Sequence, residues 1–227
     1  MAQQLGHRHV IALDLPGHGN SELPPSWEPD ALARDVLAAV RRRWPGEHIW
    51  VGHSWGGKIA VAAAAADSST RGVILIDAVP ASEFRLPDPA QTAADLFAGE
   101  LDPWPSLDSA LAAVRKLPQY SPWTPAVELA FRRGVSVQPD GRVVPHLSRV
   151  KATTILRSLA MDLSPAAAAI HAPVLILSAP EGWFDEDQQA LFPSATFVRL
   201  NGNHWLQISN VDGSAATVLG WLRTHAL

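Results

Sequence analysis

A serine flanked by glycines stands between an apolar run and a helix-forming run. Gly52-His53-Ser54-Trp55-Gly56 matches the pattern G-x-S-x-G, with the predicted strand Ile49-Trp50-Val51 before it and the predicted helix 55–66 as its continuation. A strand followed by a helix places such a serine on a tight turn, where its hydroxyl is exposed and the helix N-terminus favours developing negative charge. We expect Gly52 and Gly56 to allow close approach of the backbone. The plainer alternative is a glycine-rich loop with a surface serine, and the flanking strand and helix weigh against it.

A serine hydroxyl is a weak nucleophile unless a base removes its proton. His204 is the best candidate base because it follows the predicted strand 195–200 and the turn Asn201-Gly202-Asn203, and precedes the last predicted helix. Most of the other histidines are better explained as solvated or capping residues. His7 and His9 would share one face of a strand, but no third ligand accompanies them, so no metal site and no cofactor are expected.

These candidates depend on a regular alternation of strands and helices. Short apolar runs without alternation are typical of parallel strands covered by helices on both faces. The sequence therefore predicts a doubly wound α/β fold with a mostly parallel sheet. The expected strands are 9–13, 49–51, 73–76, 174–177 and, nearer an edge, 195–200; the expected helices are 30–43, 55–66 and 212–225.

One region interrupts this alternation. Residues 81–150 hold nine of the 19 prolines, a short helical pattern at 107–117 and a turn signal at Pro139-Asp140-Gly141. We interpret 81–150 as a helical insertion into a core formed by 1–80 and 151–227.

Composition limits the classes of partner. With 47% apolar and 18% charged residues among 227, the chain is expected to fold as a globular protein. A net charge of -4 offers no basic field for phosphates, so nucleic acid is not expected. No apolar run approaches the roughly 20 residues that span a bilayer, and Asp14 interrupts the only apolar run near the N-terminus. No membrane partner is expected, and the cytoplasm is the default location.

Three motifs together resemble the α/β-hydrolase superfamily, in its lidded esterase-like branch. They are Asp14-Leu15-Pro16-Gly17-His18-Gly19-Asn20-Ser21, Gly52-His53-Ser54-Trp55-Gly56-Gly57 and Gly202-Asn203-His204-Trp205. The resemblance implies that Ser54 is the nucleophile, that the Trp55 N–H is an oxyanion donor, and that 81–150 form a cap. A serine in this position, where an aspartate could stand, argues against haloalkane dehalogenase and epoxide hydrolase chemistry and favours acyl transfer to water.

The acid of the expected triad departs from the family pattern. The family most often places it in a G-x-x-D turn after the strand that here is 174–177, but this chain offers only Glu181 and Asp185 there. Some relatives take the acid from the end of the strand after the nucleophile helix, where this chain has Asp77. We favour Asp77 and keep the other two as alternatives.

The beginning of the chain is the second departure. Two strands, a third strand ending in a His-Gly loop, and a helix precede the corresponding segment in the family, whereas Met1 lies eight residues before the first predicted strand. The missing third strand normally lies between 9–13 and 47–51, and its loop supplies the second oxyanion donor. We expect either direct pairing of these two segments or a slot that another chain or a lost N-terminal segment fills, with Met1 an internal methionine of a longer protein.

The expected activity is that of a serine hydrolase acting on an ester or related acyl substrate. An acyltransferase or thioesterase, and a non-catalytic or truncated relative, are the alternatives. His53 and Trp205 are the expected substrate-binding residues, and a homo-oligomer is left open. The substrate is expected to be small and apolar because aromatic and aliphatic side chains are frequent in the insertion and near the motifs: Leu96, Phe97, Trp104, Trp123, Phe131, Trp55 and Trp205.

Overall fold

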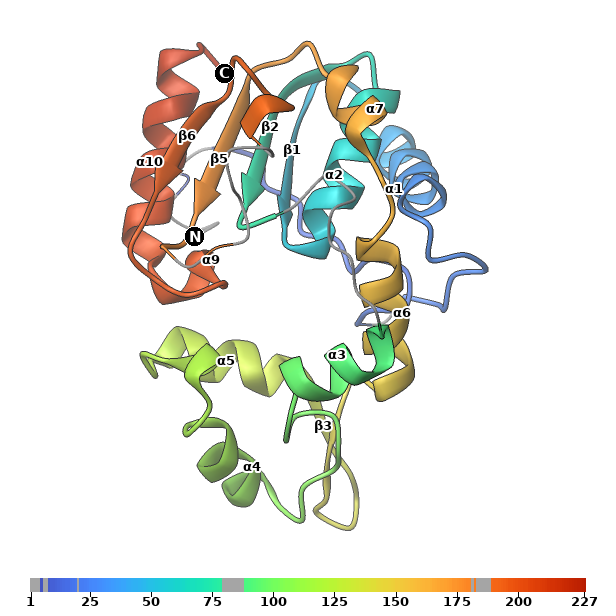
Figure 1. Cartoon of the computed structure of the whole chain (residues 1–227), viewed down its shortest axis with the longest axis vertical. Coiled ribbons are helices and arrows are strands. Elements are labelled where there is room, and N and C mark those ends of the chain that lie inside the picture. Colours follow the sequence, from blue (N-terminus) through green and yellow to red (C-terminus); the bar gives the residue numbers. More distant parts are fainter. Residues whose placement is uncertain (1–4, 6–7, 20, 79–87, 181, 183–188) are drawn as a thin grey trace. The chain divides into compact units, whose positions relative to one another are not determined.

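The computed structural model describes the chain apart from residues 1–4, 6–7, 20, 79–87, 181 and 183–188 (Figure 1). The chain forms two compact units. The sheet unit comprises Met1–Leu13, Pro24–Arg85 and Ser158–Leu227, and the helical unit comprises Asp14–Leu23 and Leu86–Arg157.

The sheet unit contains a four-stranded parallel sheet in the order β1-β2-β5-β6. These strands are β1 (His48–His53), β2 (Thr70–Ile76), β5 (Val174–Ser178) and β6 (Thr196–Arg199). Helices α1 (Pro29–Arg43), α2 (Trp55–Ala66) and α7 (Ser164–Ala168) lie on one face, and α10 (Val211–Thr224) with the short α9 (Leu206–Ser209) lies on the other (Figure 1). The doubly wound α/β prediction is therefore confirmed, as is the edge position of the strand predicted at 195–200.

Local sequence accounts for the two helices nearest the serine. Helix α1 begins at Pro29, ends in three arginines that complement its dipole, and buries one stripe that includes Leu32 and Val36. Helix α2 is buried on nearly all sides because it lies between the sheet, α1 and α7. Its alanine-rich sequence suits both the helical backbone and this close packing.

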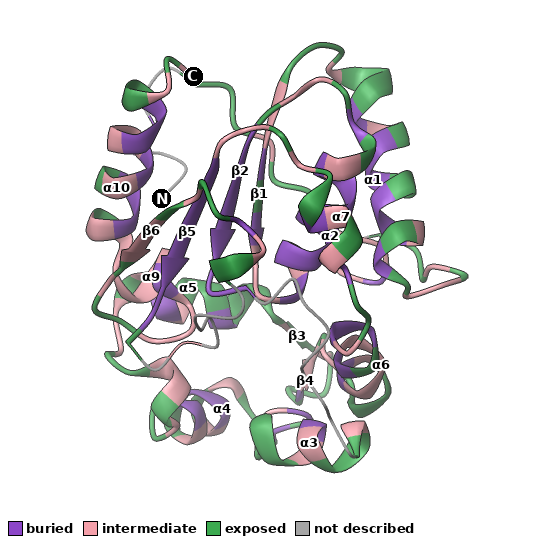
Figure 2. Cartoon of the chain, turned by 45° about the horizontal axis from the view of Figure 1, so that its top comes forward, coloured by how far each residue is buried: buried purple, intermediate pink, exposed green. Residues whose placement is uncertain are grey.

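The core on the α10 side of the sheet is built from every second residue of β2 and β5, because successive side chains of a strand point to opposite faces. Ile74 and Ile76 of β2 and Leu175 and Leu177 of β5 pack with Trp221 of α10 in one apolar cluster. In Figure 2 the buried residues run along both strands. Each such side chain contributes roughly 1.5–3 kcal/mol when it leaves water, so β2 and β5 form a firm base for the loops that follow them.

The prediction of a strand at residues 9–13 was wrong. Residues 9–13 are irregular, with Val10 43% and Leu13 38% exposed. Among the described residues β1 pairs only with β2, and Val51 of β1 is 50% exposed. Direct pairing between 9–13 and 47–51 therefore does not form, and no described residue pairs with the other edge of β1. An apolar run becomes a strand only where a neighbour pairs its backbone, which is why the pattern alone misled.

The helical unit contains α3 (Pro89–Leu96), α4 (Leu107–Val114), η2 (Pro118–Tyr120), α5 (Pro125–Arg133) and the hairpin of β3 (Val135–Val137) and β4 (Val143–Pro145). It has a core of its own, to which α4, η2, α5 and the hairpin contribute. Helix α6 (Arg149–Leu159) leads back to the sheet unit. Pro139-Asp140-Gly141 forms the expected turn at the hairpin, with Gly141 at φ 85°. Trp104 and Phe131 pack edge to face at 5.8 Å in this core, so these two rings are used in packing.

Candidate active site

Three residues from distant parts of the sequence meet at the carboxyl end of the sheet. Ser54 follows β1, Asp77 follows β2, and His204 lies in the loop between β6 and α9. The register places His53 beside Ile76 and Ile76 beside Leu177, so three neighbouring strands end at the same level. In open α/β sheets this edge is where ligands and reactive groups are placed.

The three side chains form one hydrogen-bonded chain. His204 Nε2 lies 2.9 Å from Ser54 Oγ, and His204 Nδ1 lies 2.7 Å from Asp77 Oδ2. A carboxylate only accepts, so Nδ1 carries the proton and Nε2 is left to accept the serine proton. Asp77 is nearly inaccessible, with 1% of its side chain exposed, against 25% for His204. A serine, a histidine and a carboxylate bonded in this order are the arrangement that can activate a serine hydroxyl.

Among the three expected acids, Asp77 is the one whose position relative to His204 is described. Glu181 and Asp185 lie outside the described residues. The second oxygen of Asp77, Oδ1, accepts the Ala179 N–H at 3.1 Å and lies 3.4 Å from Ser178 Oγ. The end of β5 and the loop after it, where the family most often carries the acid, thus supply donors to the Asp77 carboxylate after β2.

These donors were missed in the sequence, where Ser178 and Ala179 look like ordinary loop residues. Gly182 completes the enclosure, because a Cβ on it would lie 2.1 Å from Asp77 Oδ1 and 2.6 Å from Ser178 Oγ. A glycine a few residues after a strand was the only available signal. It indicates close packing without saying against what.

The backbone is strained at two of the three positions. Ser54 has φ 51° and ψ −123°, and Asp77 has φ 43°. Non-glycine residues in this region cost of order 1–3 kcal/mol each and persist where their surroundings hold them. Here the Ser54 N–H donates to the Ile76 carbonyl at 3.1 Å and the Asp77 N–H to the Leu177 carbonyl at 2.7 Å. The turns that present Ser54 and Asp77 are thus fixed by neighbouring strands.

The glycines of the serine motif differ in how closely other atoms approach them, and not as expected. An added Cβ on Gly52 would lie 2.3 Å from the Gly56 carbonyl oxygen, as expected. Gly56, however, would meet nothing within 4 Å, and the expectation for it was wrong. The close approach falls on Gly57, whose Cβ would lie 2.2 Å from that of Ala78. One residue further along α2 turns the side-chain direction by about a quarter turn, from open space into contact with the end of β2.

Trp55 opens α2, directly after the serine, where the resemblance places an oxyanion donor. Its indole is buried, donates from Nε1 to Ser158 Oγ at 2.9 Å, and lies 5.9 Å from the Trp27 ring. Lys58, one turn later, is fully buried, and its ammonium group donates to the Met161 carbonyl. Burial lowers the pKa of Lys58 to about 8. Trp55 thus ties α2 to the last turn of α6, and Lys58 ties it to the segment that follows α6. The sequence did not indicate either role.

The two expected substrate-binding residues both contact His204. The His53 ring lies 4.7 Å from the His204 ring, and His53 Nε2 lies 2.8 Å from the His204 backbone oxygen. Burial, and then the nearby His204, lower the pKa of His53 to about 4. The Trp205 ring meets that of His204 edge to face at 5.4 Å. Their part in substrate binding stays a prediction.

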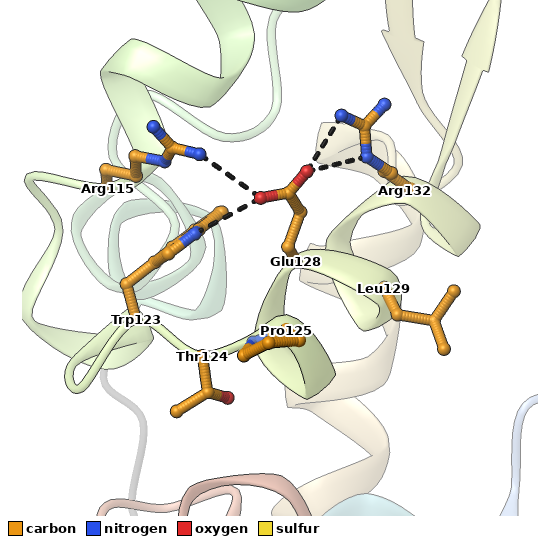
Figure 3. A pocket seen from close by; sticks show the side chains of 7 residues that line it. All are labelled: Arg115, Trp123, Thr124, Pro125, Glu128, Leu129 and Arg132. Carbon is orange, nitrogen blue, oxygen red and sulfur yellow. Dashed lines mark hydrogen bonds and ion pairs between the residues drawn. The ribbon is translucent and has the colours of Figure 1, made fainter.

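A separate groove of about 530 Å³ lies in the helical unit (Figure 3). Its charges are largely paired, since Glu128 bonds Arg115 at 3.1 Å and Arg132 at 2.8 Å and also accepts from the Trp123 indole. No serine–histidine pair is among its lining residues, which are Arg115, Trp123, Thr124, Pro125, Glu128, Leu129 and Arg132.

Within the described ranges, no three histidine, cysteine, aspartate or glutamate side chains form a group that could hold a metal ion. In the same ranges no helix combines the length and apolar character that a membrane span requires.

Two known proteins resemble this sequence over part of their length. A 2-(acetamidomethylene)succinate hydrolase of Mesorhizobium japonicum is 31% identical over 171 residues, covering 74% of this chain and 59% of that protein. A pimeloyl-[acyl-carrier protein] methyl ester esterase of Xylella fastidiosa is 38% identical over 81 residues, covering 35% of this chain and 30% of that protein. The chain therefore spans less than two thirds of the length of either relative.

Solved structures agree on the fold. The crystal structure of E-2-(acetamidomethylene)succinate hydrolase matches with a TM-score of 0.73 and 22% identity, over 92% of this chain and 79% of that one. A lipase-esterase related protein from Clostridium acetobutylicum matches with a TM-score of 0.70 and 16% identity, over 96% and 86%. The family described as alpha/beta hydrolase fold matches residues 1–211. On this match, and with the parallel sheet to support it, the chain belongs to the α/β-hydrolase family.

Proposed function

We propose that the chain is a serine hydrolase that cleaves an ester or a related acyl substrate through an acyl-enzyme on Ser54. The observation that carries this proposal is the continuous hydrogen-bonded chain from Asp77 through His204 to Ser54. The relatives, named as a hydrolase and a methyl ester esterase, support a hydrolytic reaction. Their names differ in substrate and do not select one for this chain.

The geometry supports a two-step acyl transfer. In the first step Ser54 Oγ attacks the acyl carbon while His204 Nε2 takes the hydroxyl proton, and that proton then leaves with the alcohol or other leaving group. In the second step His204 takes a proton from water, the resulting hydroxide attacks the acyl carbon, and Ser54 is released with its proton restored. Asp77 keeps His204 in the required tautomer and stabilises the imidazolium that forms in each step.

Two further roles belong to this proposal. The Trp55 N–H, at the first residue of α2, would stabilise the oxyanion, a contribution worth about 10²–10³ in rate for one donor. The helical unit would act as the cap that the family resemblance implies. A small, apolar acyl substrate is retained as a proposal, although Trp104 and Phe131 are already used in packing.

Turnover of a small aryl ester tests the proposal. Ser54→Ala should abolish hydrolysis while leaving the fold intact, because binding survives and the covalent route does not. Ser194→Ala, which removes an exposed serine of the same unit, is the matched control and should keep wild-type turnover. Hydrolysis by Ser54→Ala at the wild-type rate would overturn the proposal. A folded wild-type chain that turns over no ester would favour the non-catalytic alternative.

A further inference from the structure

His53 stands directly before the proposed nucleophile, yet its side chain reaches the loop of the proposed base. We propose that His53 is a positioning residue for His204, holding the base in reach of Ser54 through a hydrogen bond from its Nε2–H to the His204 backbone carbonyl. This inference rests on the proposed function and assigns His53 a role other than contact with substrate. The bond joins residues 151 positions apart in the sequence, at 2.8 Å.

The chemistry of this contact fixes the state of the ring. A backbone carbonyl can only accept, so the 2.8 Å contact requires a proton on Nε2 of His53. A neutral imidazole then has its other nitrogen, Nδ1, unprotonated. His53 therefore differs from His204, whose proton lies on Nδ1 toward Asp77, and the two adjacent rings hold opposite tautomers.

His53 belongs to a regular, hydrogen-bonded strand, whereas the loop that it contacts is irregular. His53 is the last residue of β1 and is registered beside Ile76 of β2, whereas His204 lies in the irregular segment between β6 and α9. The neighbours of His204 are held locally: the Asn203 N–H donates to Ser209 Oγ, and the Trp205 N–H to the side chain of Asn203. The bond from His53 instead ties this segment to the strand that carries Ser54. Strand β1 therefore holds both the loop of His204 and the turn of Ser54, which fixes the distance between the two side chains.

The charge of His53 suits this task. His204 must become a cation in each step, and a second cation 4.7 Å away between ring centres would oppose it. Burial and the proximity of the His204 ring lower the pKa of His53, and they outweigh the hydrogen bond to the His204 backbone and the nearby Asp77, which act in the opposite direction. At neutral pH His53 is therefore an uncharged donor, which a lysine or arginine in this position could not be.

Steady-state kinetics of three variants separates positioning from substrate binding. His53→Gln keeps an amide N–H at about the reach of Nε2, His53→Asn carries the same group on a shorter side chain, and His53→Leu carries no donor. We expect the Asn and Leu variants to lose up to about 10²-fold in kcat with little change in KM, and the Gln variant to recover most of that loss. A raised KM with unchanged kcat, or equal losses in the Gln and Asn variants, would overturn the inference.

Histidine-selective ¹⁵N NMR of the full chain tests the same bond without relying on activity or on a variant of His53. The His53 resonance should report a neutral ring protonated at Nε2 between pH 6 and pH 8, both in the wild type and in Ser54→Ala. An Nδ1–H tautomer, or titration near the ordinary pKa of about 6.5, would overturn it. If Ser54→Ala stays active while the NMR result holds, the proposed function fails and the hydrogen bond stands.

Discussion

The two oxygens of the Asp77 carboxylate have different partners: one accepts from His204 at 2.7 Å, and the other accepts the Ala179 N–H at 3.1 Å and lies 3.4 Å from Ser178 Oγ. The carboxylate is therefore oriented from both sides. Asp77→Asn should lower kcat by about 10⁴-fold, because an amide in this place favours the wrong tautomer of His204. Glu181→Gln and Asp185→Asn are the comparison variants and should cost much less. If either of them is the more damaging in ester turnover, Asp77 is not the acid.

Gly182 should be needed for catalysis although it carries no functional group. In Gly182→Ala the new methyl would lie 2.1 Å from Asp77 Oδ1, so the acid or the loop must move. We expect kcat to fall by roughly 10–10²-fold, because small displacements of a catalytic group are costly. Gly220→Ala in α10, where an added Cβ has its nearest neighbour at 4.0 Å, is the control and should keep wild-type kcat. Equal activity of the two variants would show that the loop yields without disturbing Asp77.

The two glycines at the start of α2 should differ in their effect on stability. Gly57→Ala should lower the free energy of unfolding by about 1–3 kcal/mol, since its Cβ would overlap that of Ala78 at 2.2 Å. Gly56→Ala meets open space and should be neutral or stabilising by up to about 1 kcal/mol through helix propensity. Urea denaturation of both variants measures the difference. The opposite order would mean that the turn after β1 is packed differently.

The lowered pKa of the buried Lys58 makes the stability of the fold depend on pH. Burial lowers its pKa from 10.5 to about 8 in the folded chain, so between these values the unfolded chain binds the additional proton. The free energy of unfolding should therefore rise with pH from about 8 toward 10, with the protonated buried lysine destabilising the fold at lower pH. Lys58→Met should remove this rise, and Lys116→Met, at an exposed position, should keep it. Chemical denaturation at several pH values compares the three proteins, and an unchanged slope in Lys58→Met would contradict the assignment.

The sequence was informative where local pattern and chain order suffice. Apolar runs located β2 and β5, and the G-x-S-x-G context located Ser54 at a strand-to-helix turn. Asp77 could be proposed because some members of the family that the chain resembles carry the acid at the end of the strand after the nucleophile helix. His204 could be proposed because it follows the last predicted strand and precedes the last predicted helix. The residues that support Asp77 and His204 could not be proposed from the sequence. The bonds from Ala179 to Asp77 and from His53 to His204 join positions more than 100 residues apart.

The error at 9–13 has a different cause. Its apolar residues satisfy the pattern of a strand, but a strand also needs a paired neighbour, and the described residues provide none beside β1. The expectation that Gly56 is closely packed was wrong by one residue along the helix. Gly56 faces open space, and Gly57, the next residue of α2, faces the end of β2. Both outcomes depend on tertiary contacts that periodicity does not encode.

Labelling with a fluorophosphonate followed by peptide mass spectrometry tests whether Ser54 is the nucleophile. This reagent reacts with serines that a neighbouring base activates, so we expect one adduct, on the peptide that carries Ser54, and its loss in both Ser54→Ala and His204→Ala. A folded wild-type chain without any adduct, or an adduct on a different residue that persists in Ser54→Ala, would mean that Ser54 is not the nucleophile.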